Sequence, residues 1–506
     1  MKLVEVLGDR FVNGADDAVA YEGPIAGTRG KLNVAETILS IAAAQDALER
    51  QAEPGSRVGV LSNHQVETYV SVLSCITSNR TFIPLNPKFP ESRLDSVLTL
   101  GAVDVILTDE KSAGIAARVA GGRPVVDMSA ILSAWRAPDP VAAAPLLSSW
   151  RQRLALATAD RDAIAYIMFT SGSTGIPKGV PISYGNLQSY VSGVTDLVEI
   201  PRGLRFTQFF DLSFDLSIHD IFISNVSWGT LVAPSAIDLM MPSGYISREL
   251  LDVWFSVPLV GAQLAQAKVS SEFAGLQHIL FCGETLPMET VIGCRPWQAE
   301  GGHMWNLYGP TEATIAFTAA EITNSDCSHG STTIGMPFGA NEVAVSTGDG
   351  IVRNPPAGTE GELLLGGPQV FTGYSTNVDS PFVGQDDHWY RSGDLIRVDD
   401  DGLFFRGRVD SQVKYRGYRI ELGEIENAIR RQHNVNTVAV VLVGDAAMAR
   451  IVAYYIDSEC PGGIDLEVLG RDLPAYMVPS TCIGLEQMPV NANHKIDRRQ
   501  LAERQD

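Results

Sequence analysis

Cysteine is scarce in this sequence, and long apolar runs are absent. The six cysteines form no CxxC pair and stand at no zinc spacing from a histidine, so we expect thiols in a reducing compartment. The first residues, MKLVEVLGDRF, lack the apolar run and cleavage site of a signal peptide, and no stretch approaches the ~20 apolar residues that span a bilayer. These absences predict a cytoplasmic protein that does not enter a membrane.

Basic residues are also few. The chain has 38 lysines and arginines against 59 aspartates and glutamates, which gives a net charge of −21. A nucleic-acid-binding protein would carry a basic patch, and none stands out, so that class is set aside. An anionic substrate such as ATP would have to be held by a few placed donors, because the overall field repels it.

What the sequence does contain is an alternation of short apolar runs with longer amphipathic segments. With 506 residues, 45% of them hydrophobic, the chain predicts two or three units. Apolar runs bounded by polar, glycine or proline residues are typical of strands buried in an α/β sheet, and the segments between them have the length of crossover helices. We expect strands at 58–61, 103–107, 163–169 and 278–281, helices at 33–51 and 67–79, and a Pro/Ala-rich connector at 137–147.

The pattern changes from about residue 361 to short β-like pieces with many turns. After Asp410 come a basic strand-like segment, QVKYRGYRI, a helix-like segment, ELGEIENAIRRQ, and two more strand candidates. We therefore expect an α/β fold in two domains. A large domain over 1–409 would have α/β sheets flanked by helices and a β-rich subdomain, and a small, mobile α+β domain would occupy 410–506.

The segment YIMFTSGSTGIPKG, which begins at Tyr166, joins a buried strand to a loop of serines, threonines and glycines closed by Lys178. Glycines let backbone N–H groups approach a polyanion, hydroxyls add donors, and the lysine supplies charge, so such a loop can hold a triphosphate. It is not a Walker A loop, because Pro177 stands where the second glycine belongs. Composition alone leaves a flexible Ser/Gly turn as an equal alternative.

Two later segments fit a nucleotide. In NLYGPTE, Tyr308 could stack on a base, Thr311 could bond a phosphate, and Glu312 could hold Mg²⁺ beside that phosphate. In YRSGD, Asp394 follows a turn and is suited to bonding two ribose hydroxyls. As isolated strings, both are more often ordinary turns than sites.

Taken together and in order, seven segments resemble the successive core motifs of the adenylate-forming superfamily of acyl-CoA synthetases, luciferases and peptide-synthetase adenylation domains. These segments are TSGSTGIPKG, FDLSIHDIF, NLYGPTE, GELLLGG, YRSGDL, GRVDSQVKYRGYRIELGEIE and NANHKID. The resemblance covers nearly the whole chain. It implies an enzyme, a ligase that uses ATP and Mg²⁺ to join a carboxylic acid to AMP.

The resemblance assigns a role to each motif residue. Lys495 would be the catalytic lysine, which neutralises charge as the substrate carboxylate attacks the α-phosphorus. Thr311 would contact the α-phosphate and Glu312 the magnesium ion, Asp410 would be the hinge, and Gly417 would line the path of an incoming thiol. By resemblance, the phosphate loop comprises Thr170, Ser171, Gly172, Ser173, Thr174, Gly175 and Lys178, and the adenosine contacts are Gly283, Glu284, Thr285, Asn306, Tyr308, Asp394 and Arg408.

The segment FFDLSFDLSIHDIF matches the motif that lines the acyl pocket. In amino-acid-activating members, the carboxylate at the position of Asp215 pairs with the substrate's α-ammonium group, which a buried aspartate needs because an unpaired interior charge is costly. The alternative is that Asp215 bonds backbone N–H groups in a turn. A lone histidine such as His219 is better explained as a satisfied structural residue on the pocket wall. The other implied pocket residues are Leu216, Phe255, Leu280, Cys282, Leu307, Ile315 and Ala316.

This apolar pocket is most like that of free-standing ligases that load L-proline on a carrier protein, although His219 and Ala316 depart from the expected pattern. The chain has no room for a carrier domain after Lys495, so we expect transfer to the phosphopantetheine thiol of a separate peptidyl carrier protein. The alternatives are an acid–CoA ligase that uses free coenzyme A, activation of another small apolar amino acid, and a catalytically silent homologue. The last is disfavoured because Lys178, Glu312 and Asp394 are present together with Lys495.

Overall fold

The structure is a computed structural model of the chain. It describes residues 7, 9–10, 17–136, 140–156, 160–172, 177–270, 273–323, 332–376, 380–383, 389–410, 412–444, 448–490 and 496–504. No helix within those ranges is long and apolar enough to cross a membrane.

The chain divides into two compact units. The first comprises Met1–Pro87, Leu98–Met168 and Gly179–Val409. The second comprises Asp410–Asp506 together with two short segments, Lys88–Val97 and Phe169–Lys178. The sequence pattern did not indicate that these two short segments group with the C-terminal residues.

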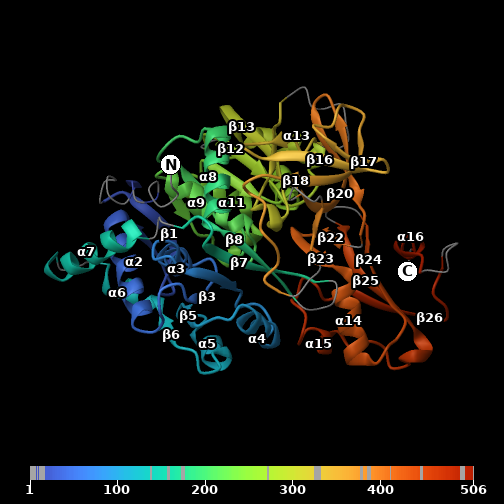
Figure 1. Cartoon of the computed structure of the whole chain (residues 1–506), viewed down its shortest axis with the longest axis horizontal. Helices are drawn as coiled ribbons and strands as arrows, with labels where there is room; N and C mark the ends of the chain where they lie inside the picture. Colours follow the sequence, from blue (N-terminus) through green and yellow to red (C-terminus); the bar gives the residue numbers. More distant parts are fainter. Residues whose placement is uncertain are drawn as a thin grey trace. The chain divides into compact units, whose positions relative to one another are not determined.

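A six-stranded sheet in strand order β6-β5-β3-β4-β7-β8 is built from the N-terminal residues (Figure 1). The pairs that join β3 through β7 are parallel, and helices such as α2 and α3 bury almost complete faces, so the α/β class predicted from the apolar runs is confirmed. Asn33 and Glu36 close a capping box at the start of α2. The bounds are α2 Val34–Glu49, β3 Arg57–Leu61, α3 Val66–Ile76, β4 Thr81–Leu85, α4 Glu91–Leu100, β5 Val105–Thr108, α5 Ala113–Val119, β6 Val125–Asp127, α6 Met128–Ala134, β7 Ile164–Thr170, β8 Lys178–Ser183 and α8 Tyr184–Val198.

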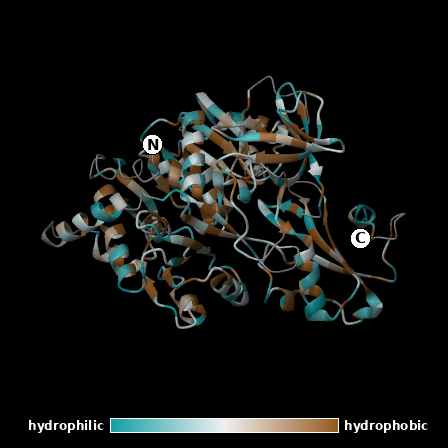
Figure 2. Ribbon diagram, in the orientation of Figure 1, coloured by the Kyte–Doolittle hydropathy of each residue, from teal (hydrophilic) through white to brown (hydrophobic). Residues whose placement is uncertain are grey.

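A nine-stranded sheet in order β15-β14-β13-β12-β11-β9-β10-β1-β2 forms the centre of the first unit. Its strands from β10 through β13 pair in parallel. β10 and β11 are buried along their whole length, and apolar residues such as those of β10 and β12 are brown in Figure 2, as expected for strands covered on both faces. The bounds are β1 Val19–Ile25, β2 Thr28–Asn33, β9 Arg205–Thr207, α9 Leu216–Val226, β10 Thr230–Val232, α10 Ala236–Met240, α11 Pro242–Glu249, β11 Val253–Ser256, α12 Pro258–Ala265, β12 Leu276–Phe281, α13 Met288–Cys294, β13 Gln298–Tyr308, β14 Thr318–Glu321 and β15 Met336–Pro337.

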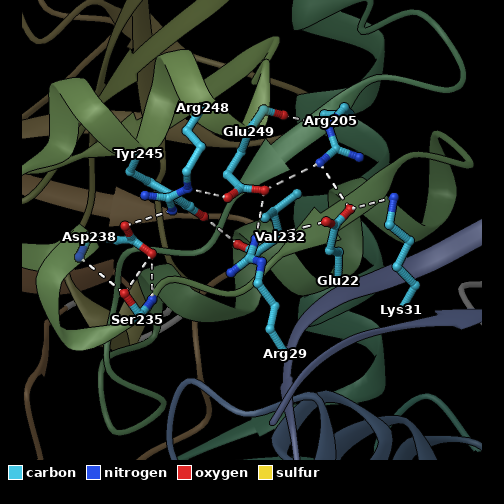
Figure 3. A network of polar contacts seen from close by, with 10 residues as sticks. All are labelled: Glu22, Arg29, Lys31, Arg205, Val232, Ser235, Asp238, Tyr245, Arg248 and Glu249. Carbon is cyan, nitrogen blue, oxygen red and sulfur yellow. Dashed lines mark hydrogen bonds and ion pairs between the residues drawn. The ribbon is translucent and has the colours of Figure 1, made fainter.

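A network of ion pairs fastens α11 to this sheet (Figure 3). Glu249 of α11 accepts from Arg29 of β2 at 2.6 Å, and Arg205 of β9 reaches Glu22 of β1 at 3.1 Å. Glu249 and Glu22 are mostly buried, so their charges need these partners. The network thereby fixes the edge of the sheet next to the strands that lead into the candidate site.

An antiparallel sheet in order β17-β16-β18-β20-β19, with β21 paired to β20, forms the predicted β-rich part of the first unit. In this sheet Asp394 of β20 is the register partner of Arg408 of β21. The bounds are β16 Glu342–Thr347, β17 Gly350–Arg353, β18 Glu360–Gly366, β19 Phe382–Val383, β20 Trp389–Asp399 and β21 Gly402–Arg408.

The second unit has its own core, in which α14 packs with β24 and β25. β24 and β25 are antiparallel, and β26 joins β25 in parallel. This is the α+β pattern expected for the C-terminal residues. The bounds are β22 Gln412–Tyr415, β23 Tyr418–Glu421, α14 Leu422–His433, β24 Val438–Val443, β25 Arg450–Ile456, α15 Leu466–Leu469, β26 Thr481–Leu485 and α16 Arg498–Ala502.

Two expectations about local structure were wrong. The connector expected at 137–147 lies largely in a helix, α7 Pro140–Leu156, because its alanines favour helix and the buried Trp150 and the Arg153–Glu49 pair hold it in place. The single strand expected over QVKYRGYRI is a hairpin, in which Arg416 and Gly417 have φ of 52° and 83°. Such a turn twists with its strands and needs a residue like glycine at positive φ.

Candidate active site

The carboxyl ends of three parallel strands bring the predicted pocket residues into one region. Phe255 of β11 lies beside Leu280 of β12, and Cys282 is the first residue after that strand. Phe281 pairs with Asn306 of β13, so residues 282–285 and 307–312 leave the sheet at neighbouring positions. Open α/β sheets bind ligands at this edge.

The loop that follows β13 is strained. Thr314 and Ile315 have φ of 59° and 70°, a conformation that β-branched residues rarely adopt and that costs on the order of 1–3 kcal/mol each. Gly309 is required before it, because a Cβ there would lie 2.7 Å from the Cα of Ala316. Strain of this kind persists only where surrounding contacts hold it, and it is concentrated at functional sites.

Asp215 is buried at the start of α9 and does not cap that helix. Its Oδ2 atom has no hydrogen-bond partner among the described residues. Burial raises the pKa of Asp215 from 3.8 to about 7; hydrogen bonds from the Thr311 hydroxyl and the Ile315 backbone N–H oppose the rise, and the nearby Glu312 carboxylate adds to it. Desolvation therefore outweighs the two donors, and no described residue gives the carboxyl a cationic partner.

The remaining predicted pocket residues belong to one buried apolar cluster. Phe255 packs against His219, with ring centroids 4.4 Å apart. A hydrogen bond of 2.7 Å joins His219 Nδ1 to the Tyr190 hydroxyl. The other ring nitrogen, Nε2, has no partner within the described part of the chain. Burial lowers the pKa of His219 to about 3, so its ring is neutral. The cluster members are Leu216, Phe255, Leu280, Cys282, Leu307, Ile315 and Ala316.

Three residues predicted to contact adenosine are joined directly. The Tyr308 hydroxyl donates to Asp394 Oδ2 at 2.5 Å, and Arg408 bonds the other carboxylate oxygen. All three lie in the first unit, and Asp394 is 2% exposed. The Asn306 amide instead donates to Thr333 O at 2.8 Å and to Thr332 Oγ1 at 2.9 Å, so it holds a neighbouring segment. Residues 283–285 follow the end of β12, where Gly283 has φ of 96°.

Glu312 offers an oxygen for a divalent cation. The side chain is 1% exposed, and Oε1 accepts a hydrogen bond of 2.8 Å from the Tyr374 hydroxyl. No group of three or more potential metal ligands occurs among the residues described. This arrangement fits magnesium, which commonly binds through one or two carboxylates and the phosphates of a substrate.

The described part of the predicted phosphate loop belongs to the second unit. Ser171 Oγ donates to Arg419 O at 2.9 Å, Gly172 N donates to Glu424 Oε2 at 3.2 Å, and Lys178 Nζ lies 3.7 Å from Glu421. Three other predicted loop residues, Ser173, Thr174 and Gly175, and the predicted catalytic Lys495 lie outside the described residues.

The residues predicted for the hinge and the thiol path, Asp410 and Gly417, are also in the second unit. Asp410 Oδ1 accepts from the backbone N–H of Gln412 at 3.1 Å. Gly417 has φ of 83° in the β22–β23 turn, a conformation that favours glycine whatever lies beside it. Its role beside a thiol is therefore a separate proposal.

Sequence reasoning missed three residues that support the site: Tyr190, Gln369 and Tyr374. Tyr374 bonds Glu312, Tyr190 bonds His219, and the Gln369 amide donates to Ala316 O at 2.7 Å. Gln369 and Tyr374 directly follow the GELLLGG motif, in PQVFTGY, and this position was the only available signal.

Comparisons with known proteins agree on one family. The family model described as AMP-binding enzyme matches residues 10–375. The chain is 32% identical over 468 residues to the L-proline–[L-prolyl-carrier protein] ligase of Streptomyces coelicolor, over 88% of this chain and 87% of that protein. It is 30% identical to the D-alanine–D-alanyl carrier protein ligase of Lactiplantibacillus plantarum, over 91% of each.

Solved structures give the same result. The adenylation domain AlmE of Vibrio cholerae, crystallised with glycyl-adenosine-5′-phosphate, superposes with a TM-score of 0.82 at 27% identity, over 99% of this chain and 96% of that one. The resemblance seen in the seven motifs is thereby confirmed, and with it the class of enzyme. The chain belongs to the AMP-binding enzyme family and is an AMP-forming ligase.

Proposed function

We propose that this enzyme uses ATP and magnesium to activate a small apolar amino acid, with L-proline as the best candidate. The aminoacyl adenylate then passes to the phosphopantetheine thiol of a separate carrier protein. The proposal is supported by the relatives named for proline and D-alanine carrier ligation, and by a structural neighbour that holds a glycyl adenylate.

The single observation that carries the proposal is the Oδ2 atom of Asp215, which is buried and has no hydrogen-bond partner among the described residues. A buried Oδ2 without a partner is costly, and an α-ammonium group would supply both the charge and the donor that it lacks. Fatty and aryl acids have no such group. The site therefore favours an amino acid over those acids.

The choice of a small apolar side chain follows from the pocket lining. Apart from Asp215 and the neutral His219, the lining is apolar and buried, with Phe255, Leu280 and Ile315 among its members. A charged side chain would enter this pocket without a counter-charge. Proline would lose little conformational entropy there, because its ring is already rigid.

The residues also suggest how amino acid and ATP cooperate. The Thr311 hydroxyl donates to Asp215 in this structure, whereas the family motif gives it the α-phosphate. When the substrate ammonium takes Asp215, Thr311 is released to donate to that phosphate. Glu312 would hold the magnesium ion, which supplies charge stabilisation to the phosphates. Asp394, bonded by Tyr308 and Arg408, would accept from the ribose hydroxyls.

A panel of amino acids in ATP–pyrophosphate exchange should show L-proline above every charged amino acid, because no described pocket residue besides Asp215 carries a counter-charge. Preference for another small apolar amino acid would keep the class and change only the identity. A clear preference for glutamate, lysine or arginine would contradict the pocket assignment. The second half-reaction is then tested by supplying a phosphopantetheinylated carrier protein with a free thiol, or free coenzyme A, as the acceptor.

The exchange reaction should also depend on pH through Asp215. Its pKa of about 7 means that the carboxyl loses its charge as pH falls, so kcat/KM for the amino acid should fall about tenfold per pH unit below 7 and level off above it. The measurement is the exchange rate at low amino acid and saturating ATP, from pH 5.5 to 8.5. With both substrates saturating, the fall should be much weaker. Equal pH dependence in both regimes would assign the titration to another group.

A further inference from the structure

The side chain of Gln369 contacts the strained turn at residues 313–316. The side chain is 1% exposed, and its Nε2 lies 2.7 Å from Ala316 O, 3.3 Å from Ala313 O and 3.4 Å from Thr314 O. One amide group therefore donates to carbonyl oxygens before and after Thr314 and Ile315, the two residues with positive φ. Those contacts are what such a turn needs in order to persist.

The orientation of this amide is fixed by its neighbours. Asn341 Nδ2 donates to Gln369 Oε1 at 2.7 Å, so the oxygen must face Asn341 and the NH₂ group must face the carbonyls, which only accept. The Thr314 hydroxyl donates to the backbone oxygen of Gln369 at 2.6 Å. The turn and Gln369 are thus joined in both directions.

The turn itself carries three groups assigned to the amino-acid pocket. The Ile315 backbone N–H donates to Asp215, and the side chains of Ile315 and Ala316 belong to the pocket cluster. We propose that Gln369 is a positioning residue that sets the shape of the amino-acid pocket by holding residues 313–316. The inference rests on the proposed function, since it assigns the pocket to an amino acid.

The first test is the variant Gln369→Met, which keeps the length of the side chain and removes its donors. We expect KM for the amino acid to rise on the order of tenfold to a hundredfold, because small displacements of a binding group have effects of this size. KM for ATP should stay within about threefold of its original value, because the held residues lie on the amino-acid side.

The matched control is Gln45→Met. Gln45 is equally buried, and its Nε2 donates to Ser74 O and to Thr77 Oγ1, away from the turn. A comparable loss of stability is expected in both variants, but only Gln369→Met should change KM for the amino acid. Equal changes in KM in the two variants, or none in either, would overturn the proposal.

A second measurement does not depend on catalysis. Hydrogen exchange at the amides of residues 313–318 should become faster in Gln369→Met and stay unchanged in Gln45→Met, since opening of the turn exposes them. Should Gln369→Met fail to fold, Thr314→Val removes only the hydroxyl bond and should act in the same direction with smaller size. If the unaltered enzyme activated no amino acid, the proposed function would fail. Separately, an unchanged rate of amide hydrogen exchange at residues 313–318 in Gln369→Met would overturn the role of Gln369.

Discussion

Replacing Asp215 with asparagine should lower kcat/KM for the amino acid by two to three decades in ATP–pyrophosphate exchange. Asparagine keeps the shape but removes the charge that the substrate ammonium needs, and losing one charge of a buried pair costs ~3–5 kcal/mol. The buried Oδ2 atom has no other partner in the described structure that could compensate. KM for ATP should change much less.

The same substitution should stabilise the unliganded enzyme. The folded-state pKa of Asp215 is raised from 3.8 to about 7, so its contribution to stability is fully present below pH 3.8 and is lost as pH rises through 7. The cost above pH 7 is on the order of 4 kcal/mol. Asparagine does not titrate, so Asp215→Asn should raise the melting temperature at pH 8 and raise it less at pH 5.

Asp211 provides the control with the opposite behaviour. Its carboxylate accepts from Asn63 at 2.5 Å, and lies 3.0 Å from both His64 and Asn86, so Asp211→Asn would set an NH₂ group against donors. That variant should lose ~1–3 kcal/mol of stability and keep its KM for the amino acid. Equal losses of kcat/KM at Asp215 and Asp211 would mean that the pocket is misplaced.

Secondary structure was predictable where a segment's own residues determine it. The expected strand at 278–281 lies within β12, and the expected helix at 33–51 is α2, whose capping residues Asn33 and Glu36 are three positions apart. The prediction failed at α7, whose stability depends on Trp150 and on Arg153 reaching back to α2. It failed again where a glycine turned one apparent strand into the β22–β23 hairpin.

The candidate site shows the same division. Motifs named Asp215, Glu312 and Asp394 because each motif is contiguous in the sequence. The contacts that hold them come from far along the chain: Tyr374 bonds Glu312 across 62 residues, and Gln369 bonds Ala316 across 53. The unpartnered Oδ2 of Asp215 among the described residues is likewise a property of three-dimensional packing, which the motif that names Asp215 does not contain.

The second large effect is expected at Lys495, which we propose as the lysine that completes the site for adenylate formation. Lys495→Ala should lower that half-reaction by on the order of 10²–10³-fold, because the charge that develops on the phosphate loses its cation. Transfer of a supplied aminoacyl adenylate to the thiol should be spared, because AMP leaves in that step and no pyrophosphate is released. The two half-reactions are therefore measured separately.

Asp410→Pro should give the reverse result. We propose that the second unit turns about Asp410 between adenylation and thiol transfer, and proline would fix φ near −65° and remove a backbone donor at that point. Adenylate formation should then persist while thiol transfer falls, since the unit could not turn to bring Gly417 beside the thiol. The two variants test the mechanism together, because each should lose the half-reaction that the other keeps. If Lys495→Ala and Asp410→Pro lose the same half-reaction to the same extent, the two-pose mechanism does not hold for this enzyme.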